Sequence, residues 1–163
     1  MKWFSNPQTL EELKQQYKKL ALKHHPDLGG NTADMQGINN EYDILFAKLK
    51  NTHATADGKT YKASKETTET PDEFKNIINA LINLDGINIE LCGSWLWITG
   101  NTKEHKEVLK GLHFRWSKSK CAWYYHTADY KKSSNKTYSL DEIRDLYGSE
   151  TIKSEPQLKL AII

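Results

Sequence analysis

Two stretches near the N-terminus place apolar residues at steps of three and four, which is the spacing of one face of an α-helix. The first stretch covers residues 9–24, and its apolar face comprises Leu10, Leu13, Tyr17, Leu20, Ala21 and His24. The second covers residues 32–49 and carries Met35, Ile38, Tyr42, Leu45, Phe46 and Leu49. This pattern predicts two amphipathic helices that pack together as a hairpin.

The turn between these helices is marked by breaker residues. Pro26 disfavours helical backbone at the residue before it and cannot donate a hydrogen bond into a continuing helix, so the first helix should end at His25. The pair Gly29-Gly30 supplies a turn, and Asn31 or Thr32 can cap the second helix. The predicted hairpin therefore carries residues 25–27, His-Pro-Asp, at its tip.

The second half of the chain mixes the two periodicities. Residues 87–91 and 95–99 alternate as strands, residues 113–125 are predicted to form a hairpin, and helical patterns precede, separate and follow these strands. The order α-β-β-α-β-β-α predicts a small α+β domain with a mainly antiparallel sheet. Capping boxes are predicted at the helix starts Thr9/Glu12, Thr70/Glu73 and Ser139/Glu142.

Residues 51–70 lack apolar periodicity and are rich in Thr, Lys, Glu and Ala, which predicts a flexible linker; continuation of the preceding helix over part of this stretch is the alternative. The predicted organisation is a helical hairpin at 1–50, a linker at 51–70, an α+β domain at 71–148 and a tail at 149–163.

The strand at 95–99 is apolar on both sides, because Trp95 and Trp97 face one way while Leu96 and Ile98 face the other. Both faces are then covered, or one aromatic face is exposed. Between residues 101 and 136 there are nine Lys or Arg residues and three Asp or Glu residues. Aromatic side chains beside basic ones bind single-stranded nucleic acid, so a nucleic-acid or partner surface is one interpretation, and a core with solvated lysines is the other. The candidate surface comprises Trp95, Trp97, Lys106, Lys110, Arg115, Trp116, Lys118, Lys120, Trp123 and Tyr125.

Composition limits the number of domains, the partners and the cellular compartment that we expect. The 163 residues suit one domain or two small ones, and a net charge of +2 does not by itself indicate nucleic-acid binding. Cys92 and Cys121 have no metal or redox spacing, so we expect buried free thiols. Without a signal peptide or a long apolar run, a soluble cytoplasmic protein is expected, with no membrane partner.

The segment Tyr17-Lys18-Lys19-Leu20-Ala21-Leu22-Lys23-His24-His25-Pro26-Asp27, followed by a helix with Ile38-Asn39-Asn40-Glu41-Tyr42, resembles the J-domain of DnaJ-type co-chaperones across roughly residues 10–49. The Gly-Gly pair after the tripeptide is similar to the short J-domains of viral and mobile-element proteins. The resemblance implies docking on a DnaK-type (70-kDa heat-shock) chaperone and stimulation of its ATP hydrolysis. The implied docking residues are Lys14, Tyr17, Lys18, Lys19, Lys23, His25, Pro26 and Asp27.

The charges of the first helix agree with this interpretation. We expect Lys14, Lys18, Lys19 and Lys23 to lie along the side away from the leucines. Like charges four residues apart cost a few tenths of a kcal/mol, so such a stripe does not serve helix stability. It suits a complementary acidic groove, where it raises the encounter rate and fixes orientation. A solvated face is the alternative.

The chain also departs from the family. Residues 1–8 stand before the basic helix, so we expect no full first helix there and hypothesise that Trp3 and Phe4 fill its groove as a short hook. The general DnaJ apparatus for clients, with its Gly/Phe-rich region and zinc repeats, is missing. With no catalytic or metal-ligand constellation in the sequence, we expect neither enzyme activity nor a cofactor. The predicted function is a co-chaperone whose C-terminal domain targets the chaperone. The alternative is an accessory protein of a phage or mobile element that binds DNA or a replication protein.

Overall fold

The computed structural model describes residues 1–55, 57–126, 136–147 and 152–153. This part of the chain is α+β, as predicted, and it has five α-helices and two antiparallel sheets. In chain order its elements are α1 (Leu10–His24), the 3-10 turn η1 (Pro26–Leu28), α2 (Thr32–Leu49), β1 (Thr52–Ala54), β2 (Thr60–Lys62), α3 (Pro71–Ile82), β3 (Ile87–Cys92), β4 (Trp95–Gly100), α4 (Lys106–Gly111), β5 (Arg115–Ser117), β6 (Ala122–Tyr125), α5 (Leu140–Tyr147) and β7 (Ile152–Lys153).

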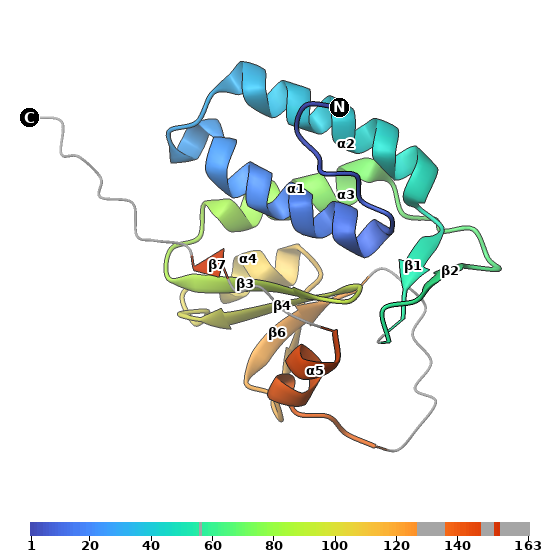
Figure 1. Cartoon of the computed structure of the whole chain (residues 1–163). Coiled ribbons are helices and arrows are strands. Elements are labelled where there is room, and N and C mark those ends of the chain that lie inside the picture. The colour runs from blue at the N-terminus through green and yellow to red at the C-terminus, as the bar shows by residue number, and fades with distance from the viewer. Residues whose placement is uncertain (56, 127–135, 148–151, 154–163) are drawn as a thin grey trace, which may run out of the picture.

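The larger sheet has the strand order β5-β6-β4-β3-β7, with every neighbouring pair antiparallel. Helices α1, α2 and α3 lie on one side of it and α5 lies on the other (Figure 1). Short β7, which falls in the predicted tail, pairs with β3 at Asn88 and Ile89. The rest of that tail lies outside the described residues. Among the described helices, none is long and apolar enough to cross a membrane.

The two faces of β4 confirm the predicted alternation. Leu96 and Ile98 belong to the hydrophobic cluster on the side of α1–α3, whereas Trp97 belongs to a second cluster with partly buried Trp95 packed against it. Two residues of α5, Leu140 and Ile143, also pack on this second cluster. Of the two arrangements open at the sequence level, the sheet therefore has both faces covered.

The helix starts differ in how their capping boxes form. At α5, Ser139 and Glu142 exchange both reciprocal hydrogen bonds, at 2.7 and 3.2 Å. Thr9 accepts from the Glu12 N–H, as a capping residue does. Thr70 makes no side-chain capping bond, so the box predicted at the start of α3 is wrong, and Pro at the first helical position marks that start instead.

The N-terminal residues form the hypothesised hook beside the hairpin. Phe4 is buried against Tyr42, and the Trp3 ring packs edge-on against His24 with 5.1 Å between ring centroids. The Glu41 carboxylate accepts the backbone N–H groups of residues 2–4. Gly37 makes room for the hook, because a Cβ there would lie 2.7 Å from the Trp3 indole nitrogen. The hook thus explains a glycine in the middle of α2, where glycine is otherwise unfavourable.

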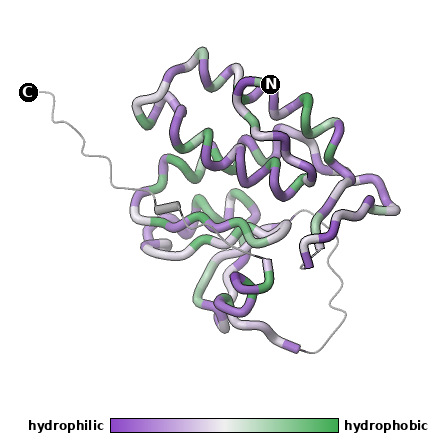
Figure 2. Tube along the Cα trace, viewed as in Figure 1, coloured by the Kyte–Doolittle hydropathy of each residue, from purple (hydrophilic) through white to green (hydrophobic). Residues whose placement is uncertain are grey.

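Residues 51–70 contain structure that their composition did not predict. Strands β1 and β2 pair antiparallel, and the hairpin is attached to α1, because Glu11 binds the His53 ring (2.8 Å) and accepts the Ala54 N–H (3.1 Å). This segment is mostly hydrophilic, unlike the apolar strands β3 and β4 (Figure 2). Polar contacts therefore position it, which is why apolar periodicity gave no signal there. Neither a structureless linker nor a continued helix describes β1 and β2.

Helix α3, assigned from sequence to the second domain, packs against both helices of the hairpin. Phe74 contacts the rings of Tyr17 and Tyr42, at centroid distances of 6.0 and 6.3 Å. One cluster of buried residues runs from Phe4 through the hairpin and α3 to Trp123 in the sheet. The hairpin and the α+β unit consequently share a core, in contrast to the predicted pair of modules joined by a linker.

Candidate docking site at the hairpin tip

The tip of the hairpin is a closely hydrogen-bonded turn. His25 ends α1 with extended backbone (φ −64°, ψ 132°), which is the conformation that a following proline favours. Its carbonyl accepts the N–H groups of Leu28 and Gly30, at 3.0 and 2.9 Å. Asn31 then caps α2 by accepting the Ala33 N–H at 2.7 Å. The predicted end of α1 and one of the two predicted caps of α2 are confirmed.

The two ionisable side chains of the tip have different exposures. The side chain of His25 is only 13% exposed and its Nδ1 accepts the Asp27 N–H at 3.2 Å. The Asp27 side chain is 56% exposed, with one carboxylate oxygen 3.7 Å from the same nitrogen. His25 therefore acts as an internal brace of the turn, while the Asp27 carboxylate is presented at the surface.

The two glycines contribute in different ways. Gly29 has φ +86°, a left-handed conformation that glycine adopts without steric cost. Gly30 is required for space, because a Cβ there would lie 2.0 Å from the His24 carbonyl oxygen. The close return of the chain onto the end of α1 thus depends on Gly30.

The basic side chains of α1 do not form one exposed stripe. Lys19 and Lys23 are exposed, as expected. Lys14 is 4% exposed and Lys18 is 0% exposed, so the prediction that they lie on the outer side of the helix is wrong. Tyr17, expected on the apolar face and also among the docking residues, is fully buried.

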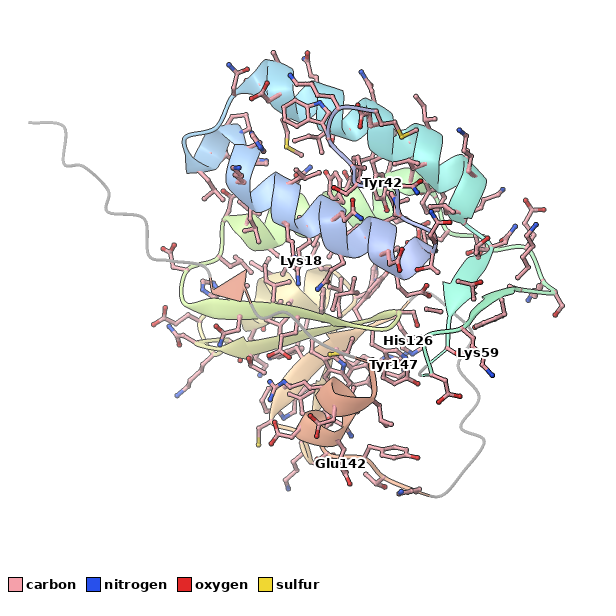
Figure 3. All side chains as sticks on the ribbon, in the orientation of Figure 1. Lys18, Tyr42, Lys59, His126, Glu142 and Tyr147 are labelled. Atoms are coloured by element: carbon pink, nitrogen blue, oxygen red, sulfur yellow. The ribbon has the colours of Figure 1, made fainter. Side chains whose placement is uncertain are left out.

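Contacts from distant parts of the chain cover these three residues. Lys14 Nζ lies 2.6 Å from Glu69 Oε1 and 5.1 Å from the centre of the Phe74 ring. Lys18 Nζ donates to the carbonyl oxygen of Ile89 in β3 (3.3 Å), and Figure 3 shows Lys18 between α1 and the sheet. The Tyr17 hydroxyl donates to Asn39 Oδ1, and burial raises the pKa of Tyr17.

The candidate aromatic surface is largely interior. Trp97 and Trp123 are buried, and Trp95 and Tyr125 are half-buried. Only Trp116 among the five candidate rings is exposed, at 48%, beside exposed Arg115 on the edge strand β5. The basic candidates Lys106, Lys110 and Lys118 are exposed, and half-buried Lys120 lies over the Trp97 ring. Most of these aromatic residues therefore belong to the core, which was the second of the two interpretations.

Under α5 the structure places an ion pair that sequence reasoning missed. Glu90, assigned to the polar side of its strand, is buried, and both its oxygens accept from Arg144 at 2.7 Å. These hydrogen bonds, together with one to Asp141, outweigh desolvation and raise the pKa of Arg144. The signal available in the sequence was the pair of tryptophans on the adjoining strand, which indicated that this face could be covered.

The cysteines differ from each other. Both are free thiols, with Cys92 buried and Cys121 exposed, so the expectation of a buried thiol is wrong for Cys121. Within the described part of the chain, no three His, Cys, Asp or Glu side chains gather as a metal site would require.

Comparison with protein families, with curated proteins and with solved structures found no match.

Proposed function

We propose that this protein docks on a DnaK-type chaperone through the hairpin tip and stimulates its ATP hydrolysis. The observation that carries the proposal is the His25-Pro26-Asp27 turn, in which a braced backbone presents an exposed carboxylate. A rigid turn loses little conformational entropy when it binds, so its polar groups can be placed accurately against a partner.

Two exposed lysines on α1 extend the proposed docking surface beyond the His25-Pro26-Asp27 turn. Lys19 and Lys23 follow one another at a spacing of four and place positive charge on the last two turns of α1 before the tip. A partner groove with acidic residues for the lysines and a basic residue for the carboxylate would be complementary to this arrangement. In this proposal the sheet-bearing half of the chain selects where the chaperone acts.

The nucleic-acid alternative has less support. Stacking on bases needs exposed aromatic faces, and Trp116 is the one candidate ring that is clearly exposed. The +2 net charge adds no strong electrostatic attraction for phosphates.

Steady-state ATP hydrolysis by a bacterial DnaK-type chaperone tests the proposal. We expect the unmodified protein to stimulate hydrolysis and Asp27→Asn to lose most of that stimulation. Asp57→Asn is the matched control, because Asp57 is an exposed carboxylate on the β1–β2 hairpin, at the opposite end of the molecule (Figure 1).

Charge reversal at the lysines tests chaperone binding separately from the stimulation that depends on Asp27. Lys19→Glu and Lys23→Glu should weaken chaperone binding, more strongly at low salt, whereas Lys48→Glu on the exposed side of α2 should not. Stimulation that is equal in the unmodified protein and Asp27→Asn, or absent with several host chaperones, would exclude the proposed function.

A further inference from the structure

Four of the eight proposed docking residues are exposed, and three others are covered by the rest of the chain. Asp27, Lys19 and Lys23 are exposed. Lys14 and Lys18 are buried on the side of α1 that faces α3 and the sheet. A partner that meets the tip therefore meets only part of the basic helix.

Polar contacts accompany the apolar core on this side of α1. They include the Lys14–Glu69 ion pair and the hydrogen bond from Lys18 to the Ile89 carbonyl, and the Lys75–Asp43 pair (2.6 Å) joins α3 to α2. Removing two charges from water costs nearly as much as their mutual attraction returns, so buried ion pairs add little net stability. These polar contacts therefore resist separation of this side less than an equal area of apolar contact would.

We propose, on the premise of the proposed function, that this structure is a closed state in which Glu69, Phe74 and β3 sequester Lys14, Tyr17 and Lys18 from the chaperone. Opening of this contact completes the basic docking surface. The tip, with Lys19 and Lys23, makes the first encounter in the closed state, and full affinity belongs to the open state.

The equilibrium between the closed and open states sets the expected change in the apparent Kd for the chaperone. If only the open state binds fully, the apparent Kd equals the intrinsic Kd divided by the open fraction. A substitution that weakens the cover without touching a docking residue must therefore tighten binding, which is the reverse of what damage to a binding site does.

Two variants weaken the cover in this way. Glu69→Gln removes the charge that Lys14 faces while keeping nearly the same side-chain volume, and Phe74→Leu removes the ring over Lys14 and beside Tyr17. Arg144→Met is the matched control, because it breaks an ion pair on the opposite face of the sheet. Circular dichroism at the assay temperature establishes that each variant is folded.

Opening itself is measured without the chaperone, by brief amine labelling of the full-length protein with an N-hydroxysuccinimide ester and mass spectrometry. In the unmodified protein, Lys14 and Lys18 should react at least about tenfold more slowly than Lys19 and Lys23, which are internal controls. Both cover variants should speed labelling of Lys14 and Lys18 and leave the two controls unchanged. Arg144→Met should leave all four unchanged.

Chaperone binding is then measured on the same variants. We expect Glu69→Gln and Phe74→Leu to lower the apparent Kd by about three- to tenfold and Arg144→Met to leave it unchanged. Faster labelling with an unchanged or higher Kd would overturn the closed-state proposal while the Asp27-dependent stimulation of ATP hydrolysis still stands. Equal labelling of all four lysines in the unmodified protein would also overturn it. Absence of Asp27-dependent stimulation would remove both proposals, and that result is identified before any cover variant is made.

Discussion

The tip of the hairpin and the middle of α1 belong to one continuous stretch of chain, yet they are built in different ways. Around His25 and Asp27, the described contacts come from residues a few positions away, and the carboxylate reaches solvent. Around Lys14 and Lys18, the contacts come from Glu69 and Ile89, and both amines are buried. The pattern of one helix predicts which side chains are exposed where only local contacts surround them. It fails where distant parts of the chain pack over the helix.

The largest expected effect on stability comes from removing the Phe74 ring, which covers the middle of α1. Phe74 is buried against Tyr17 and Tyr42, so Phe74→Ala should cost about 4 kcal/mol of unfolding free energy by leaving a cavity. The exposed neighbour substitution Asn76→Ala should cost under about 0.5 kcal/mol. Urea unfolding followed by both circular dichroism and tryptophan fluorescence measures this. Two separate transitions, with only one shifted, would contradict a shared core.

The buried ion pair should show strong coupling between its partners. Glu69→Leu alone leaves the Lys14 amine buried and without this partner, and should cost about 3 kcal/mol. Adding Lys14→Met should restore most of that stability, because two apolar side chains no longer need desolvated charges to be matched. Urea midpoints of the two single variants and the double variant complete the cycle. If the stability losses of the two single variants simply added in the double variant, Lys14 and Glu69 would be shown not to interact.

At the tip, the two glycines should respond differently to a single methyl group. Gly30→Ala places a Cβ against the His24 carbonyl and should cost about 2 kcal/mol. Gly29→Ala meets nothing within 4 Å and should cost about 1 kcal/mol for its left-handed backbone. Thermal or urea unfolding gives the ranking, and the reverse ranking would show that the turn does not return so closely onto α1.

The smallest expected effect is a pH dependence at the N-terminal hook. Partial burial raises the pKa of Glu41, but hydrogen bonds from three backbone N–H groups outweigh it and hold the pKa below its usual range. The contact therefore stabilises the fold fully above the unfolded pKa of about 4.3 and is lost as the pH falls through the lower folded value. The stability difference between the unmodified protein and Glu41→Gln should shrink as the pH falls below about 4. A difference that is constant from about pH 6 to pH 3 would exclude this linkage.

Local signals in the sequence predicted most of the architecture. Helix periodicity gave α1, α2 and α3, alternation gave β3 and β4, and Pro26 with the glycines gave the tip. The same local rules failed for Lys18, Glu90 and the β1–β2 hairpin, since each depends on a partner far away in the sequence. Lysine and glutamate have no periodicity that distinguishes a solvated position from a paired, buried one.

The contact of Phe74 with the hairpin also has a consequence for synthesis. Chains are made from the N-terminus, and folding units generally close as they emerge. Here the aromatic cluster of Tyr17 and Tyr42 stays incomplete after α2 has left the ribosome, because its third ring belongs to α3. The nascent hairpin would for that interval expose Tyr17 and the Lys14 and Lys18 side of α1. Glu69 and Phe74, which cover Lys14 in the finished protein, are translated after the β1–β2 hairpin, and Ile89, which accepts from Lys18, follows α3.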